Sequence, residues 1–218
     1  MSLHPYDWSV VIVGRWNPTI LTPARIAKYI FKMEGDPARL EIGVPIDGVE
    51  PYQVKHPEDN IIVMADDRRL RIILIKMDYP TLDKAKSLAI NALNWLPYTP
   101  LSAAGFNVRF QTTDYLEKLD ELTKKDDIDE PLIRLYSKIA DRSITRMLDY
   151  KNGKINLVIT SKNGGYEVLF NFHQDSDDKD KLIEWLNTPI KDVASEVDKI
   201  LKAFALNISD MEVSDDNE

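Results

Sequence analysis

Residues 69–111 read RLRIILIKMDYPTLDKAKSLAINALNWLPYTPLSAAGFNVRFQ and are the most regular stretch of the sequence. They begin with an apolar, β-branched run over 70–77, which is typical of a buried strand. A turn is indicated at 78–80, and the following residues to Trp95 have the broad apolar face of a helix packed across a sheet. A second strand is predicted over 105–110. The stretch therefore predicts a strand, a covering helix and a strand in succession.

The sequence before this stretch also predicts strands and one helix. Two apolar runs flank the polar residues 66–69, which favours a β-hairpin. Thr22-Pro23 predicts a helix start, because threonine is a good cap and proline is tolerated at the first helical position. The elements expected in this part are a strand at 8–16, a helix from 22 to about 33, and shorter strands at 40–46, 52–55 and 61–65.

After residue 113 the sequence becomes more charged. A short amphipathic helix is predicted over 114–122, and a solvated charge run follows at 124–130. The glycine-rich turn 162–165 separates two apolar runs and predicts a second hairpin. The elements expected in this part are a helix over 131–148, strands at 155–159 and 166–172, and helices over 177–185 and 188–206.

The predicted fold class is α+β, with two lobes that each consist of an antiparallel hairpin or sheet and a helix packed across it. Residues 93–101 and 183–190 share a Trp-Leu helix end followed by Thr-Pro. Either the lobes are a pseudo-duplication, or these common features arose separately. The predicted organisation is an N-terminal α+β lobe (1–113), a charged helical connector (114–130), a C-terminal α+β lobe (131–208) and a disordered acidic tail (209–218).

Composition excludes several classes of protein. The 218 residues include no cysteine, which excludes disulfides and thiolate catalysis. The net charge is −8, but five acidic side chains lie in the last nine residues, so the body is only about −3 and lacks a basic footprint. No signal peptide or membrane-spanning run is present in the sequence. We therefore expect a soluble cytoplasmic protein that does not associate with membranes.

A basic stripe is predicted on the helix expected over 131–148. Arg134, Lys138, Arg142 and Arg146 recur every four residues and would lie along one side of that helix. Such a stripe could contact phosphates or an acidic protein surface. The ordinary alternative is a solvated face opposite the apolar residues of the same helix.

One cluster could bind a metal ion. His173, Asp175 and Asp178 follow a predicted strand, and an imidazole with carboxylates suits a divalent metal. The alternative is that Asp177 and Asp178 occupy the first turn of a helix, where negative charge is favoured. No cofactor is predicted.

No catalytic constellation is evident in the sequence, so we expect a non-enzymatic interaction protein: a subunit, adaptor or inhibitor of bacterial or phage origin. Its expected partner is another protein or a second copy of the chain. Two alternatives remain open. One is a metal-dependent hydrolase or nuclease that uses His173, Asp175 and Asp178; the other is nucleic-acid contact through the basic stripe from Arg134 to Arg146.

Overall fold

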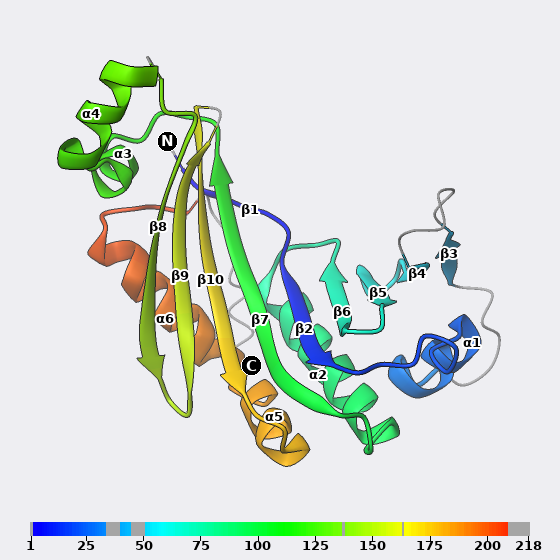
Figure 1. Ribbon diagram of the computed structural model, residues 1–218. Helices are drawn as coiled ribbons and strands as arrows, with labels where there is room; N and C mark the ends of the chain where they lie inside the picture. The colour runs from blue at the N-terminus through cyan, green and yellow to red at the C-terminus, as the bar shows by residue number, and fades with distance from the viewer. Residues whose placement is uncertain (1, 34–39, 45–50, 137, 163, 209–218) are drawn as a thin grey trace, which may run out of the picture.

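The structure is a computed structural model that describes residues 2–33, 40–44, 51–136, 138–162 and 164–208. These residues form one ten-stranded sheet whose strands pair antiparallel (Figure 1). Its order is β3-β4-β5-β6-β2-β7-β10-β9-β8, with β1 paired to β7 as well. The strands are β1 (His4–Pro5), β2 (Ser9–Gly14), β3 (Glu41–Gly43), β4 (Gln53–His56), β5 (Ile61–Ala65), β6 (Arg69–Leu74), β7 (Leu101–Thr112), β8 (Asp141–Tyr150), β9 (Gly153–Lys162) and β10 (Gly165–Asp175).

The helices are α1 (Pro23–Arg25), the π-helical η1 (Ile26–Ile30), α2 (Tyr79–Trp95), α3 (Glu117–Thr123), α4 (Asp126–Tyr136), α5 (Lys179–Leu186) and α6 (Ile190–Ala203). Helices α2, α5 and α6 lie behind one face of this sheet, which we call the inner face (Figure 1), and α3 contacts β8 and β9. Along β10 the side chains alternate, so that Phe170 and Phe172 are buried beneath helices while Asn171 and His173 face the other side. No described helix is long and apolar enough to cross a membrane.

The α+β class is confirmed, but the two-lobe pseudo-duplication is not. Strand β7 pairs with β2 on one side and with β10 on the other. One sheet therefore joins strands from both sides of the predicted connector, and the division into lobes stays a prediction. The acidic tail 209–218 lies outside the described residues.

The predicted helix over 131–148 is wrong. Helix α4 ends at Tyr136, and β8 then pairs with β9 over ten consecutive residues. A spacing of four residues places side chains on one side of a helix, but it also places them on one side of a strand, whose period is two. Arg142 and Arg146 fit both patterns, and strand pairing decided between them.

Smaller differences occur elsewhere. The helix expected from Thr22 to about residue 33 is the short α1 followed by η1, and Thr22 makes no side-chain cap hydrogen bond. The charge run 124–130 is not merely solvated, because α4 begins within it and Asp129 is buried. The hairpins β5–β6 and β9–β10 are confirmed.

Helix α2 begins at an aspartate cap. The Asp78 carboxylate accepts a hydrogen bond from the Thr81 amide at 2.8 Å and lies 2.6 Å from Lys76 Nζ. Burial alone would raise the pKa of Asp78, but these hydrogen bonds outweigh it and lower the pKa below its ordinary value. The ionised cap therefore stabilises the folded state.

We expect Asp78→Ser to retain the cap but to weaken the acid dependence of stability. The stabilisation from Asp78 is complete above the unfolded pKa and is lost as the pH falls through the lower folded pKa. Urea unfolding from pH 6 to pH 3 should show a smaller loss for Asp78→Ser than for the wild type. Asp114→Ser, at an exposed aspartate, is the control. Equal losses in the wild type and Asp78→Ser would contradict this role.

Candidate interaction site

Helices α3 and α4 project from one end of the sheet (Figure 1), and the apolar side of α4 is open to solvent. Leu135 and Tyr136 are 75% and 73% exposed, and Ile128, Leu132 and Ile133 are exposed as well. Ile128, Leu132, Leu135 and Tyr136 follow the helical spacing i, i+4, i+7 and i+8, so they share one side of α4. We call these four residues the α4 apolar face.

An ion pair holds α4 against the sheet. Asp129, the one buried residue of α4, accepts a hydrogen bond from Arg142 Nε at 2.6 Å. Both side chains are largely shielded from water, which makes such a pair stronger than one on the surface. The ion pair therefore links α4 to β8 through the one buried residue of this helix.

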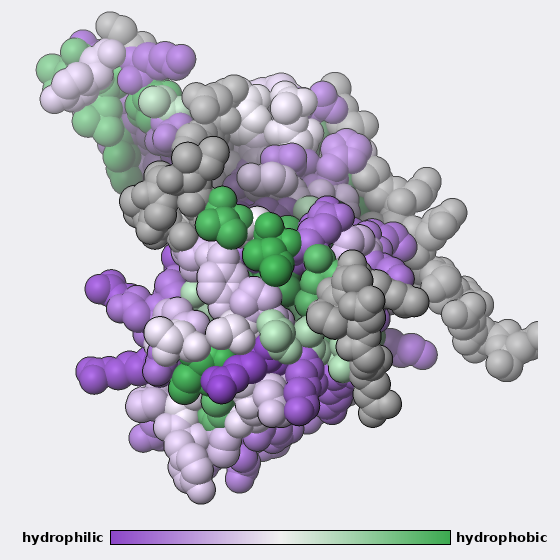
Figure 2. Space-filling view, turned by 90° about the vertical axis from the view of Figure 1, so that its right-hand side faces the viewer, coloured by the Kyte–Doolittle hydropathy of each residue, from purple (hydrophilic) through white to green (hydrophobic). Residues whose placement is uncertain are grey.

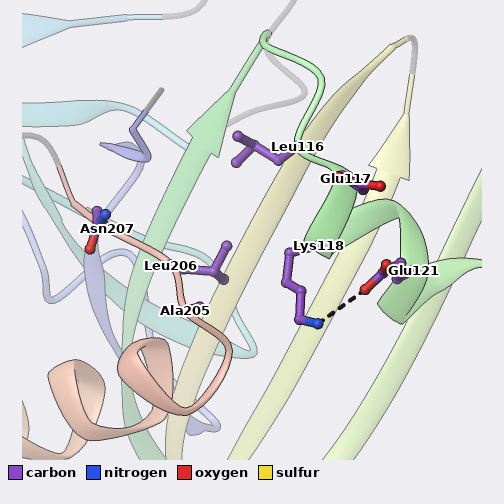
Figure 3. A pocket seen from close by; sticks show the side chains of 7 residues that line it. All are labelled: Leu116, Glu117, Lys118, Glu121, Ala205, Leu206 and Asn207. Carbon is purple, nitrogen blue, oxygen red and sulfur yellow. Dashed lines mark hydrogen bonds and ion pairs between the residues drawn. The ribbon is translucent and has the colours of Figure 1, made fainter.

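A hollow of about 420 Å³ lies on one side of α3. Figure 3 shows it between α3, which supplies Lys118 and Glu121, and the segment after α6, which supplies Leu206 and Asn207. Lys118 Nζ lies 3.0 Å from a Glu121 carboxylate oxygen. The lining of this hollow therefore includes both charged and apolar side chains.

A second hollow, of about 440 Å³, lies on the other side of α3; we call it the Ser161 pocket. Arg142 on β8 is opposite Ser161 on β9, and Ser161 is opposite Tyr166 on β10. Opposite residues of neighbouring strands point to the same face, so these three side chains form one row. The other lining residues include Tyr115 and Asp120 at α3 and Lys138 in the link to β8.

Two tyrosines converge on Asp120 in the Ser161 pocket. The hydroxyls of Tyr115 and Tyr166 donate to different oxygens of this carboxylate, each at 3.4 Å. Burial, followed by the charge of Asp120, raises the pKa of Tyr166 to about 12. The pKa of Tyr115 is raised in the same direction by desolvation and by Asp120. Both hydroxyls therefore remain protonated donors at neutral pH.

The four residues of the predicted basic stripe do not lie along one helix. Lys138 and Arg142 line the Ser161 pocket, whereas Arg134 is on α4 and Arg146 is further along β8. Arg134 is exposed and lies 3.5 Å from Glu130, and Arg146 donates to the neighbouring Thr145 carbonyl. Binding by any of these residues stays a prediction.

The proposed metal ligands are not gathered into one site. His173 Nε2 lies 2.8 Å from an Asp175 oxygen. Asp178 is the N-cap of α5 and accepts hydrogen bonds from the amides of Asp180 and Lys181, as the capping alternative predicted. Within the described ranges, no group of three or more His, Asp or Glu side chains is placed to hold a metal ion.

Exposed hydrophobic residues also occur at the β3 end of the sheet. Figure 2 faces this end and shows hydrophobic side chains among hydrophilic ones. Ile42 on β3 and Val44 just after it are exposed. The segments on either side of them, 34–39 and 45–50, lie outside the described residues, so the α3–α4 end is the better defined candidate.

Comparisons with known proteins add no family to this description. No family model matches the chain, and a search of curated proteins finds no match.

Proposed function

We propose that the chain is a non-enzymatic interaction protein that binds a protein partner through α3 and α4. The α4 apolar face is the observation that supports this proposal most. Burying a large apolar side chain is worth about 1.5–3 kcal/mol, so a helix that leaves five of them exposed forgoes a large stabilisation in isolation. Contiguous exposed apolar residues of this kind are typical of interaction sites.

The mode of binding that fits α4 is a helix laid into the groove of a partner. Such helices use apolar anchors at i, i+4 and i+7, which is the spacing of Ile128, Leu132 and Leu135. Residues 117–136 contain seven acidic and four basic side chains, a net charge of −3. The expected groove is therefore apolar with a basic rim, since opposite charges around an interface steer association and select partners.

We expect the double variant Leu135→Glu/Tyr136→Glu to abolish partner binding without unfolding the protein, because both side chains are exposed. Tagged wild-type protein and this variant would be compared in pull-downs from the native lysate, followed by mass spectrometry. The control is Tyr98→Glu, which changes a 95% exposed aromatic residue in the turn after α2. A genuine partner is retained by the wild type and Tyr98→Glu and is lost from the double variant.

Sedimentation over a range of protein concentrations tests whether the partner that binds α4 is a second copy of the chain. Self-association that the double variant removes, and that Tyr98→Glu leaves intact, would identify the partner as a second copy. The proposal is contradicted if the double variant captures the same proteins as the wild type. A wild type that stays monomeric and captures nothing specific would contradict it too.

A further inference from the structure

The Ser161 pocket has features that the binding of a protein to α4 does not require. Its floor is the row Arg142–Ser161–Tyr166 across three adjacent strands. Strands lie about 4.8 Å apart, so this row spans roughly 10 Å of the inner face. Further along the same strands that face is filled by apolar side chains such as Ile159 and Val168, which are buried. In the Ser161 pocket the row Arg142–Ser161–Tyr166 is polar, and the space above this row is open.

Arg142 is held so that part of its guanidinium remains available. Its Nε donates to Asp129 at 2.6 Å. Its two terminal nitrogens make no hydrogen bond or ion pair with any described residue. A guanidinium fixed through Nε loses little further freedom when its terminal nitrogens bind, and their fork matches two oxygens of one anion.

Lys138 supplies a second positive charge beside Arg142. Its backbone amide donates to the Tyr136 carbonyl at 2.7 Å, which fixes the chain as it leaves α4. Its ammonium group forms no ion pair within the part of the chain that the structure describes. The wall formed by Lys138, Arg142 and the Ser161 hydroxyl therefore presents several donors to the pocket, and among them Arg142 Nε already has an acceptor in Asp129.

The opposite wall carries the single carboxylate of the pocket. Asp120 already accepts from Tyr115 and Tyr166, which directs its oxygens toward the two rings. The ring of Tyr115 is exposed and lies 6.5 Å from that of Tyr166. A ligand at the basic wall would therefore also meet an aromatic surface, which the sequence did not indicate for these basic residues.

We propose that the Ser161 pocket binds an oxyanion, a phosphate or a carboxylate, between Arg142, Lys138 and Ser161. Charge-assisted hydrogen bonds from arginine and lysine to such anions are the strong class of hydrogen bond. Asp120 disfavours a second negative charge beside it, so a monoanionic group or one end of a larger ligand fits best. This proposal is independent of the partner of α4, because the pocket can be tested with small ions.

The test is a titration followed by amide and side-chain NMR of the full chain. Inorganic phosphate and acetate would be added in separate experiments, with chloride used to hold the ionic strength constant. We expect saturable shifts at Lys138, Arg142, Ser161 and Tyr166 with at least one ion. Lys138→Gln should weaken the binding by about tenfold, the equivalent of one charge-assisted hydrogen bond.

Arg134→Gln is the matched control, since Arg134 is a neighbouring exposed cation that does not line the pocket. It should leave the affinity unchanged. Ser161→Ala is a second test that removes no charge and leaves the Arg142–Asp129 pair intact. Shifts only with phosphate identify a phosphate site, and shifts only with acetate identify a carboxylate site. The absence of saturable shifts with both ions, or equal losses in Lys138→Gln and Arg134→Gln, would overturn the proposal.

Discussion

Replacing Phe106 with alanine is expected to lower the free energy of unfolding by about 3–5 kcal/mol. Phe106 is fully buried on β7 and stacks on Phe172 of β10 with ring centroids 4.8 Å apart. The ring of Trp185 on α5 lies 6.1 Å away on the inner face. Alanine would remove an aromatic ring between a strand and a helix, and the cavity could close only if β10 or α5 moved.

Urea unfolding monitored by circular dichroism would measure this loss. Met147→Ala is the control, because Met147 on β8 is 63% exposed and its removal should change stability by less than about 0.5 kcal/mol. A loss for Phe106→Ala no larger than that of the control would contradict the packing described for β7, β10 and α5.

Replacing Lys86 with alanine is expected to cost about 2–4 kcal/mol. Lys86 lies on α2 with only 2% of its surface exposed, which is unusual for lysine. Its ammonium group lies 3.0 Å from an Asp83 oxygen, donates to the Thr188 carbonyl at 2.5 Å and lies 5.7 Å from the Phe106 ring centroid. It therefore joins α2 to the segment between α5 and α6, and without it the Thr188 carbonyl would lose this donor.

Two further variants separate charge from packing at this position. Lys86→Met keeps most of the aliphatic stem, so it should be more stable than Lys86→Ala by about 1 kcal/mol. Lys199→Ala, at an exposed lysine that pairs with Glu196, should change stability by less than about 1 kcal/mol. Equal stability of Lys86→Ala and Lys199→Ala would show that the buried contacts contribute nothing.

The elements that were predicted correctly are those encoded by short-range patterns. The two apolar runs around residues 66–69 predicted β5 and β6, because a hairpin needs only two strands and a short polar turn. The apolar face of α2 predicted its place across the sheet. In both cases the residues that decide the structure are close together in the sequence.

The candidate site was not predictable in the same way. The four-residue spacing of Arg142 and Arg146 satisfies a helix and a strand equally, and only pairing with β9 decides between them. Tyr115, Asp120 and Tyr166 meet because α3 packs over the ends of distant strands, and no local spacing links them. The exposure of the α4 apolar face also depends on what the rest of the chain leaves uncovered.

The position of β2 between β6 and β7 sets a limit on when the protein can fold. Trp8, next to β2, donates its indole N–H to the Arg109 carbonyl, 101 residues further along the chain. Synthesis proceeds at about 5–20 residues per second, so β7, the second strand that pairs with β2, is made on the order of 5–20 s after β2. Val10 and Ile12, buried in the finished sheet, lack that partner during this interval. Strand β2 therefore keeps one edge unpaired until β7 has been made, and during that interval this edge is open to pairing with another chain.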